Sequence, residues 1–330
     1  MTTDFAPLAA QALTAYGLQG ISFSFLQHSE NVTFRVENGP KNLLLRLHTP
    51  LTIEMGQHGA DQAMIESELN WLDALKRARM PVPTGIRNRA GERVTRLEWE
   101  HAPLNATLLT WLDGIDYTRE LESEETAIQV GDLIGRLHKH ASHWRLPKGF
   151  RRPERGSAAF QTTLDTLRPA IADGRIAYAD FSQFETALQT LQQQLGSLRK
   201  TRQNWGLIHG DAHKGNFIFD QGRLSLIDFS LSAFGYTLFE LAIALSDTRE
   251  DLRPLVLAEY QKHMKLPANW QRLLEGLYIA SMIGTFSFWI NSPEAQETLV
   301  RRVPLIAQEY AAKFNYDERF WLNGELGVFS

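Results

Sequence analysis

One polar segment, residues 209–216, constrains the fold of this chain more than any other. It reads His-Gly-Asp-Ala-His-Lys-Gly-Asn, and the string Ile-Asp-Phe follows at residues 227–229. Asp211 and Asn216 are five positions apart, and Asp228 lies twelve positions beyond Asn216. This spacing concentrates two carboxylates and one amide in a short stretch of chain, so the segment is a candidate for chemistry.

A turn separates the two halves of this stretch. Residues 217–219 are apolar, Asp-Gln-Gly at 220–222 is typical of a turn, and residues 224–226 alternate as in a strand. A hairpin of this length returns its end near its start. We therefore predict that Asn216 and Asp228 stand at opposite feet of one hairpin and can face one ion.

The residue types suit the transfer of a phosphoryl group. Magnesium is a hard ion that prefers carboxylate and amide oxygens, and it neutralises the charge on nucleotide phosphates. Asn216 and Asp228 are the predicted magnesium ligands. A hydroxyl acceptor must also lose its proton, and a carboxylate within hydrogen-bond reach can accept it. Asp211 is the predicted base.

The string His-Gly-Asp-x-His-x-x-Asn followed by Ile-Asp-Phe resembles the aminoglycoside phosphotransferase and choline kinase superfamily, which includes homoserine-kinase-type small-molecule kinases. Residues 131–138 resemble the family's helix that leads towards the catalytic loop, and residues 235–241 resemble its segment after the metal ligand. The resemblance covers most of the chain, except for about 150–202 and the part after Asp247.

The resemblance implies an α+β, two-lobed protein-kinase-like fold, with a small antiparallel β lobe that has one helix and a larger, mainly α lobe. It implies a nucleotide-binding lobe at residues 1–112 and a catalytic and acceptor-binding lobe at 113–330. ATP and Mg²⁺ are the implied cofactors. Residues 107–114 are interpreted as a strand that ends in glycine at a hinge of about 110–114, where the backbone of Thr110 and Leu112 would meet adenine.

The first lobe is expected to begin with strands. Residues 32–36 alternate, Asn-Gly at 38–39 is a hairpin turn signal, and residues 43–47 form a second apolar strand. A helix is expected after Gly59 and should stop before the Met-Pro-Val-Pro string at 80–83. Another hairpin is expected around residues 88–91.

The resemblance implies an ion pair between Arg46 and Glu68 in this lobe. Arg46 lies mid-strand, where the resemblance implies a phosphate-pairing lysine, and an exposed strand residue is the alternative interpretation. In the helix, Ile65, Leu69 and Leu72 lie on one stripe, and at about 100° per residue Glu68 falls on that stripe. Glu66 points away from the stripe and is interpreted as a solvated acid.

Residues 27–31 would occupy the phosphate-covering loop in the resemblance, yet they contain no glycine. Without glycine the backbone approaches phosphates less freely, so Ser29 and Asn31 would have to contribute side-chain contacts. An ordinary polar turn before a strand is the alternative interpretation.

Several histidines invite a metal interpretation that the spacing does not favour. His138 and His140 would lie about 200° apart on a helix, and no carboxylate completes a zinc site, so helix-end packing is preferred. His209 and His213 are expected to orient the backbone of the catalytic loop by hydrogen bonding. Glu240 is expected to support that loop or to pack nearby, without a direct catalytic role.

Composition excludes several classes of protein. The chain has 34 Lys and Arg against 38 Asp and Glu, a mild acidic balance that gives no basic footprint for nucleic acid. There is no cysteine, which fits a reducing compartment, so a cytoplasmic location is expected. The most apolar stretch, residues 277–290, is too short and too polar to span a membrane.

The sequence therefore predicts an ATP-dependent phosphotransferase that acts on a hydroxyl of a small metabolite. Amino-alcohol, choline-like, homoserine-like, sugar and aminoglycoside acceptors remain open, as does the oligomeric state. Two alternatives are a nucleotide-binding regulatory module without turnover and a protein Ser/Thr kinase. No Ala-Pro-Glu landmark follows Asp228, which disfavours the protein kinase.

Overall fold

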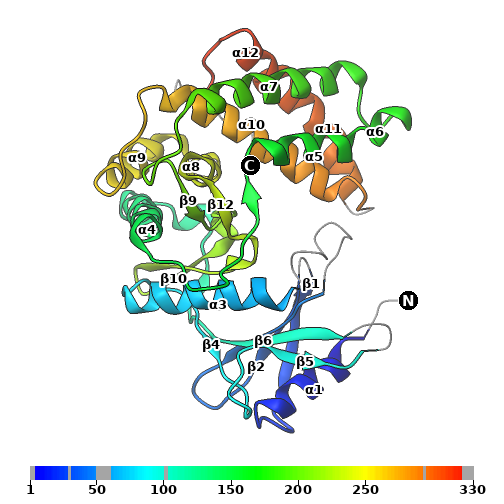
Figure 1. Cartoon of the computed structure of the whole chain (residues 1–330), viewed down its shortest axis with the longest axis vertical. Coiled ribbons are helices and arrows are strands. Elements are labelled where there is room, and N and C mark those ends of the chain that lie inside the picture. Colours follow the sequence, from blue (N-terminus) through cyan, green and yellow to red (C-terminus); the bar gives the residue numbers. More distant parts are fainter. Residues whose placement is uncertain (1–3, 29–30, 50–60, 100–102, 293–294, 322–330) are drawn as a thin grey trace. The chain divides into compact units, whose positions relative to one another are not determined.

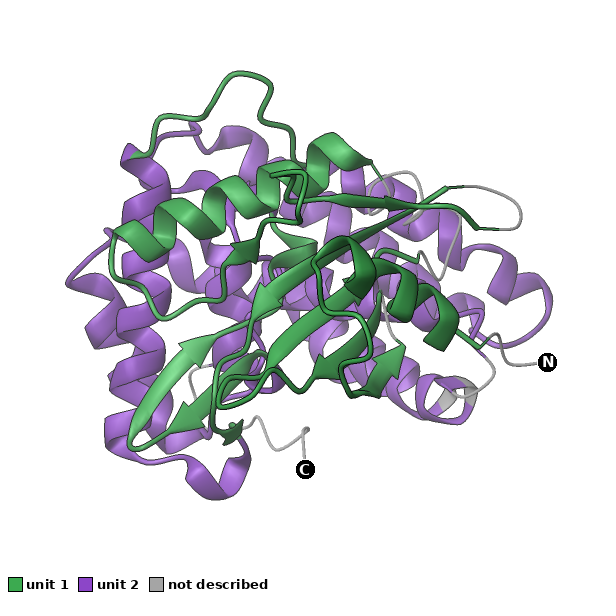
Figure 2. Ribbon diagram, turned by 90° about the horizontal axis from the view of Figure 1, so that it is seen from below, with its two compact units in different colours: residues 1–117, 144–153, 216–232 green, residues 118–143, 154–215, 233–330 purple. Residues whose placement is uncertain are grey.

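The structure is a computed structural model that describes residues 4–28, 31–49, 61–99, 103–292 and 295–321. Its residues group into two compact units, which Figure 2 distinguishes by colour. Unit 1 comprises Met1–Tyr117, Trp144–Pro153 and Asn216–Ser232, and unit 2 comprises Thr118–His143, Glu154–Gly215 and Ala233–Ser330.

Unit 1 is built on antiparallel strands, and its described residues include the α-helix α1 in addition to the helix that the sequence predicted (Figure 1). Its helices are α1 (Ala6–Ala15), α3 (Gln62–Arg77) and the short 3-10 helix η3 (Phe229–Leu231). Its strands are β1 (Phe23–His28), β2 (Val32–Val36), β3 (Leu43–Leu47), β4 (Gly85–Ile86), β5 (Thr95–Leu97), β6 (Leu104–Thr110), β7 (Ile115–Asp116), β10 (Phe217–Asp220) and β11 (Arg223–Leu226).

The main sheet of unit 1 has the order β1-β2-β3-β6-β4, with β5 also paired to β6. The strands predicted at residues 32–36 and 43–47 are confirmed as β2 and β3, and Val32 pairs with Leu47 across the predicted hairpin. Alternate residues of these strands pack with α1 in one apolar core. The intervening Arg46 lies on the other sheet face and binds α3.

Two predicted features of this sheet differ in the structure. Residues 88–91 form a turn, but its flanking strands do not pair with each other as a hairpin: β5 pairs with the beginning of β6 and β4 with its end. The strand expected at 107–114 begins earlier, at Leu104, and ends at Thr110, four residues before Gly114, where φ is 133°.

Unit 2 is mainly helical, as predicted. Its α-helices are α4 (Glu124–His143), α5 (Ser157–Leu167), α6 (Pro169–Ala172), α7 (Tyr178–Ser197), α8 (Thr237–Ser246), α9 (Arg253–Gln261), α10 (Trp270–Trp289), α11 (Gln296–Leu305) and α12 (Ala312–Asn315), with the π-helix η6 (Ile306–Ala311) before the last. The described part of unit 2 also contains the short helices η1 (Arg119–Leu121) and η4 (Glu250–Leu252) and the strands β8 (Glu154–Arg155), β9 (Trp205–Ile208) and β12 (Ala233–Tyr236), and the 3-10 helix η2 (Lys214–Asn216) begins at its residue 214.

Helix packing sets the core of unit 2. Helix α4 packs against α9, and α10 packs against α5, α7 and α8. Strand β12 pairs antiparallel with β9 and parallel with β8, so the segment entering residues 209–216 is part of a small sheet. Among the described helices, none is both long enough and apolar enough to cross a membrane.

Candidate active site

The predicted hairpin after residue 216 is present in unit 1. Strands β10 and β11 pair antiparallel, with Phe217 opposite Leu226. The backbone N–H of Ile227 then donates to the carbonyl of Asn216 at 2.9 Å, so the ladder continues to the foot of the hairpin. Asn216 and the residue directly before Asp228 are therefore hydrogen-bonded neighbours.

Asp228 adopts an unusual backbone conformation at this foot. Its φ is 56° and its ψ is 73°, in the left-handed region that Asp tolerates better than most residues. Its side chain accepts a hydrogen bond from the N–H of Ser230 at 3.3 Å, which caps η3. The carboxylate is 32% exposed, so it remains accessible to a ligand.

Arg46 lies between two carboxylates of unit 1. Its Nη1 is 2.7 Å from Oε1 of Glu68, and its Nη2 is 3.2 Å from Oδ1 of Asp228. Both side chains of the Arg46–Glu68 pair are 4% exposed. The predicted pair is confirmed as a contact, and the interpretation of Arg46 as an exposed strand residue is wrong. Glu66 is also not simply solvated, since it binds Arg93.

His48, which the sequence did not single out, lies two residues beyond Arg46, directly after the end of β3. Its Nε2 is 3.0 Å from the hydroxyl of Thr107. Burial, and then the positive charge of Arg46, lowers the pKa of His48 well below its usual value near 6.5, although Asp228 acts in the opposite sense. The imidazole is therefore neutral at pH 7.

Asp211 belongs to unit 2, in a loop held by its own histidines. The N–H of Asp211 donates to Nδ1 of His209 at 3.3 Å, and the N–H of Gly215 donates to Nδ1 of His213 at 3.1 Å. Nε2 of His213 lies 3.4 Å from Oδ2 of Asp211, whose side chain is 33% exposed. Because Nδ1 of His213 accepts, a neutral ring has its proton on Nε2, directed at that carboxylate.

Glu240 holds the start of this loop. Its two carboxylate oxygens accept the N–H of His209 at 2.6 Å and the N–H of Gly210 at 3.0 Å. Its burial alone would raise the pKa of the carboxyl, but the hydrogen bond from His138 and the charges of His209 and His138 lower that pKa below its usual value. Glu240 therefore remains ionised and supports the loop backbone.

His138 is not at a helix end, where the sequence suggested polar packing. It is buried within α4, with Nε2 3.2 Å from Oε2 of Glu240 and Nδ1 2.9 Å from the hydroxyl of Tyr260. The metal interpretation of the neighbouring histidines has no support among the described residues. Another group in unit 2 could hold a metal ion, since its possible ligand atoms all lie within 4.8 Å of one another: Asp132, Glu259 and His263.

Two further side chains link the loop of residues 209–216 to other parts of unit 2: Lys214 from within the loop and Arg155 from β8. Nζ of Lys214 is 3.1 Å from Oε1 of the buried Glu122, and the N–H of Lys214 donates to Oδ2 of Asp247 at 2.6 Å. Nη1 of Arg155 donates to the carbonyl of Gly210 at 2.8 Å. The sequence did not predict these contacts, because the partners are remote in the chain.

The proposed nucleotide-side residues are less tightly defined. Ser29 lies outside the described residues, and Asn31 is buried at the start of β2. The N–H of Thr110 donates to the carbonyl of Thr84, and its hydroxyl accepts the N–H of Thr84, each at 2.9 Å. Leu112 is half-buried beyond the end of β6.

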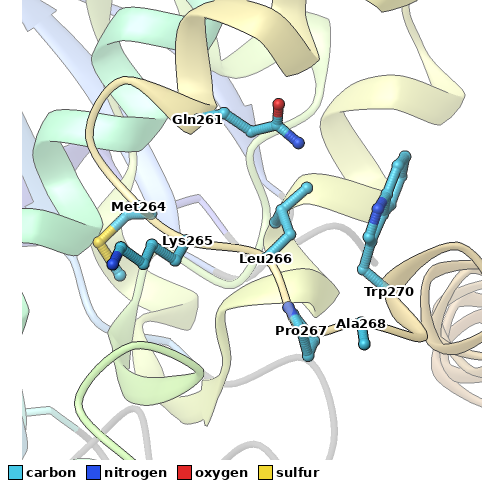
Figure 3. A pocket seen from close by; sticks show the side chains of 7 residues that line it. All are labelled: Gln261, Met264, Lys265, Leu266, Pro267, Ala268 and Trp270. Atoms are coloured by element: carbon cyan, nitrogen blue, oxygen red, sulfur yellow. The ribbon is translucent and has the colours of Figure 1, made fainter.

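A surface hollow of about 460 Å³ lies elsewhere in unit 2 (Figure 3). It follows the connection from α9 to α10, and the side chains that line it include no carboxylate. It is lined by Gln261, Met264, Lys265, Leu266, Pro267, Ala268 and Trp270. The hollow contains none of the predicted catalytic or metal-binding residues.

The model of the Phosphotransferase enzyme family matches residues 23–275, and the chain belongs to that family. It is similar to a homoserine kinase of Pseudomonas aeruginosa, 28% identical over 297 residues that cover 86% of this chain and 80% of that protein. It is also similar to an amicoumacin kinase of Bacillus subtilis, 23% identical, with 72% of this chain and 66% of that protein covered.

Solved structures show the same protein-kinase-like fold. A microcompartment-associated aminopropanol kinase has a TM-score of 0.76 at 23% identity, covering 94% of this chain and 98% of that chain. An amicoumacin kinase in complex with AMP-PNP, Ca²⁺ and Ami also has a TM-score of 0.76, at 15% identity, covering 96% and 94%. The predicted superfamily is confirmed, and the protein is an ATP-dependent small-molecule kinase.

Proposed function

We propose that this kinase transfers the γ-phosphoryl group of ATP to the hydroxyl of homoserine or a closely related amino alcohol. The similarity to a homoserine kinase over 86% of this chain supports the acceptor class. The observation that carries the chemistry is the hydrogen bond between Ile227 and Asn216, because it holds the two feet of the hairpin together and so brings the proposed oxygen ligands Asn216 and Asp228 to the same end of the hairpin.

Asn216 and Asp228 suit a magnesium ion. An amide oxygen and a partly exposed carboxylate are hard donors, and magnesium needs only one or two such protein ligands besides phosphates and water. When bound, the ion would neutralise charge on the nucleotide phosphates. Arg46 also contacts Asp228, so this arginine restrains the carboxylate and adds positive charge beside the phosphates.

Asp211 is the proposed general base. It accepts the proton as the acceptor hydroxyl forms its new O–P bond and the bond from the γ-phosphorus to the bridging oxygen breaks, which releases ADP. Nε2 of His213, at 3.4 Å, restrains one carboxylate oxygen, and the hydrogen bond to His209 holds the backbone. The proposed nucleotide contacts in unit 1 are Ser29, which lies outside the described residues, and Asn31, Thr110 and Leu112.

Mass spectrometry of reactions containing ATP, magnesium and a pooled acceptor panel tests the proposal. The panel contains homoserine, aminopropanol, choline, a sugar and an aminoglycoside. Wild type should phosphorylate homoserine or aminopropanol, and Asp211→Asn should lose about 10²–10⁴-fold in kcat, the usual contribution of a general base.

Asp211→Asn should retain the wild-type unfolding midpoint, because the carboxylate is partly exposed. Phosphorylation of only the sugar or the aminoglycoside would overturn the acceptor class. Full turnover by Asp211→Asn would overturn its role as base. Nucleotide binding without any product would favour a regulatory module, and product only on a peptide would favour a protein kinase.

A further inference from the structure

Arg152 binds four backbone carbonyls of unit 1. Its Nε donates to Ser232 at 2.6 Å, its Nη2 donates to Ser230 and, at 3.4 Å, to Phe229, and its Nη1 donates to Met64 at 3.3 Å. Arg152 comes from residues 144–153, which connect α4 to β8 and belong to unit 1 (green in Figure 2). No local sequence signal distinguishes it from the neighbouring arginine.

Three of these carbonyls follow Asp228 directly. The N–H of Ser232 also donates to the carbonyl of Phe229 at 3.0 Å, so Arg152 adds to the turn's own hydrogen bond. A planar guanidinium with five donors can bind several carbonyls at once. The left-handed backbone at Asp228 is strained and persists only where the surrounding structure holds it. Arg152 supplies such a restraint through the carbonyls that it binds after Asp228.

The fourth carbonyl connects this turn to α3. Met64 lies one helical turn before Glu68 in α3. Arg152 therefore binds the same helix that contains Glu68, the partner of Arg46. The N–H of the adjacent Arg151 donates to the hydroxyl of Ser67 at 2.8 Å, which adds a second link from this segment to α3. Residues 144–153 thus join the Asp228 turn to the helix that holds Glu68.

We propose that Arg152 is a positioning residue for phosphoryl transfer: it fixes the turn after Asp228 against α3 and so sets the direction of the metal-binding carboxylate. This inference rests on the proposed role of Asp228 as a magnesium ligand. Arg152 does not itself touch substrate or metal. Groups that hold a metal ligand in place typically change metal affinity or activity by about 10–100-fold when replaced.

Arg152→Lys separates the geometry of the contact from its charge. Lysine retains the positive charge but has three donors on a flexible stem, so it cannot reproduce the planar set of four contacts. The matched control is Arg151→Lys, because Arg151 is the next residue, its side chain is 62% exposed, and its backbone bond to Ser67 survives the substitution.

The measurement is a magnesium titration of activity at saturating ATP, together with chemical unfolding, on the full chain. Arg152→Lys should raise the magnesium concentration for half-maximal activity about 10–100-fold and lower kcat. Arg151→Lys should match wild type in both. If Arg152→Lys does not fold, Ser67→Ala provides the second variant, since it removes the other link to α3 and should shift the magnesium requirement in the same direction.

The results distinguish this inference from the proposed function. An unchanged magnesium requirement in Arg152→Lys, whether or not the protein is less stable, would show a purely structural role. With Arg152→Lys unfolded, an unchanged requirement in Ser67→Ala would have the same meaning. If Asp228→Asn retains the wild-type magnesium requirement, the proposed metal ligand itself is wrong, and the inference about Arg152 falls with it.

Discussion

At the scale of single residues, Arg46 shows how a buried charge is compensated. Its guanidinium is almost inaccessible and contacts Glu68 and Asp228 in unit 1. Removing one partner of a buried ion pair leaves the other charge without compensation, which costs more than the pair contributes while it is intact. The stability of unit 1 therefore depends on Arg46 independently of any role in binding nucleotide.

Arg46→Met should lower the free energy of unfolding by about 3–5 kcal/mol, because Glu68 would then be buried without its cation. Urea unfolding measures this loss. The double variant Arg46→Met with Glu68→Leu should recover a large part of it, since the buried carboxylate is removed and Asp228, which also loses Arg46, is 32% exposed. Additive losses in the double variant would contradict this explanation.

At the scale of elements, Glu240 on α8 connects a helix to the loop that contains Asp211. Its two oxygens accept the backbone N–H groups of His209 and Gly210, and one of them also lies within hydrogen-bond distance of Nε2 of His138 on α4. Buried N–H groups need acceptors, so this carboxylate defines the path of the chain where β9 ends. The position of Asp211 thus depends on a side chain from a different element.

Glu240→Gln should lower the free energy of unfolding by about 1–3 kcal/mol, because one buried N–H would face an amide donor in place of an acceptor. It should also reduce kcat, since the loop of Asp211 would lose part of its support. Urea unfolding and steady-state kinetics test both effects. Tyr260→Phe is the control, as it removes only the hydroxyl that contacts His138; an equal loss in both variants would contradict the argument.

Close packing between α4 and α9 gives a second test at this scale. A Cβ at Gly131 would clash with the carbonyl oxygen of Val256, so Gly131→Ala should destabilise the protein by about 1–3 kcal/mol. In α10, Gly284 has open space, so Gly284→Ala should instead stabilise by about 0.5–1 kcal/mol through helix propensity. Thermal unfolding that moves in the same direction for both would refute the packing explanation.

The alternation and periodicity of apolar residues predicted β2, β3 and the buried face of α3 correctly, because these features depend on residues that are close in sequence. Strand alternation around the Asn-Gly turn gave β2 and β3 with their correct ends, and helical periodicity placed Glu68 on the buried face of α3. The pairing of β4 and β5 along β6 depends on where two short strands meet a third one, which no local pattern specifies.

The same limit applies to the candidate site. The Asp211, Asn216 and Asp228 motif is compact in sequence, so it was visible without coordinates, and its catalytic assignments remain predictions. Arg152 contacts residues 77 to 88 positions away through backbone carbonyls, which have no sequence signature. The sequence did not single out His48, because it follows an apolar strand and the groups that shift its pKa include Asp228 and Arg152, which are remote in the chain.

At the scale of the whole molecule, the buried His48 makes stability depend on pH. Its pKa is lowered in the folded protein, so the unfolded chain binds a proton that the folded chain does not as the pH falls below about 6.5. Its contribution is therefore fully present above that pH and is lost progressively in acid. The groups that affect it include Arg46, Asp228 and Arg152.

Wild type should lose up to about 1.4 kcal/mol of unfolding free energy per pH unit below pH 6.5 because of this one histidine. His48→Asn retains a polar group beside Thr107 but cannot titrate, so its stability should fall less steeply between pH 7 and pH 5. Urea unfolding at a series of pH values measures both slopes. Parallel curves for the two proteins would rule out His48 as the source.

Unit 1 is assembled from three separate stretches of chain, the last of which ends at Ser232. During synthesis on the ribosome, Arg46 can meet Glu68 early, since they are 22 positions apart, whereas Asp228 follows Arg46 by 182 positions. The first strands of unit 1 are therefore synthesised long before residues 216–232, the last stretch of the same unit. A nascent chain stalled before residue 216 would present an incomplete first unit, which makes this interval the natural point for chaperone engagement or proteolysis.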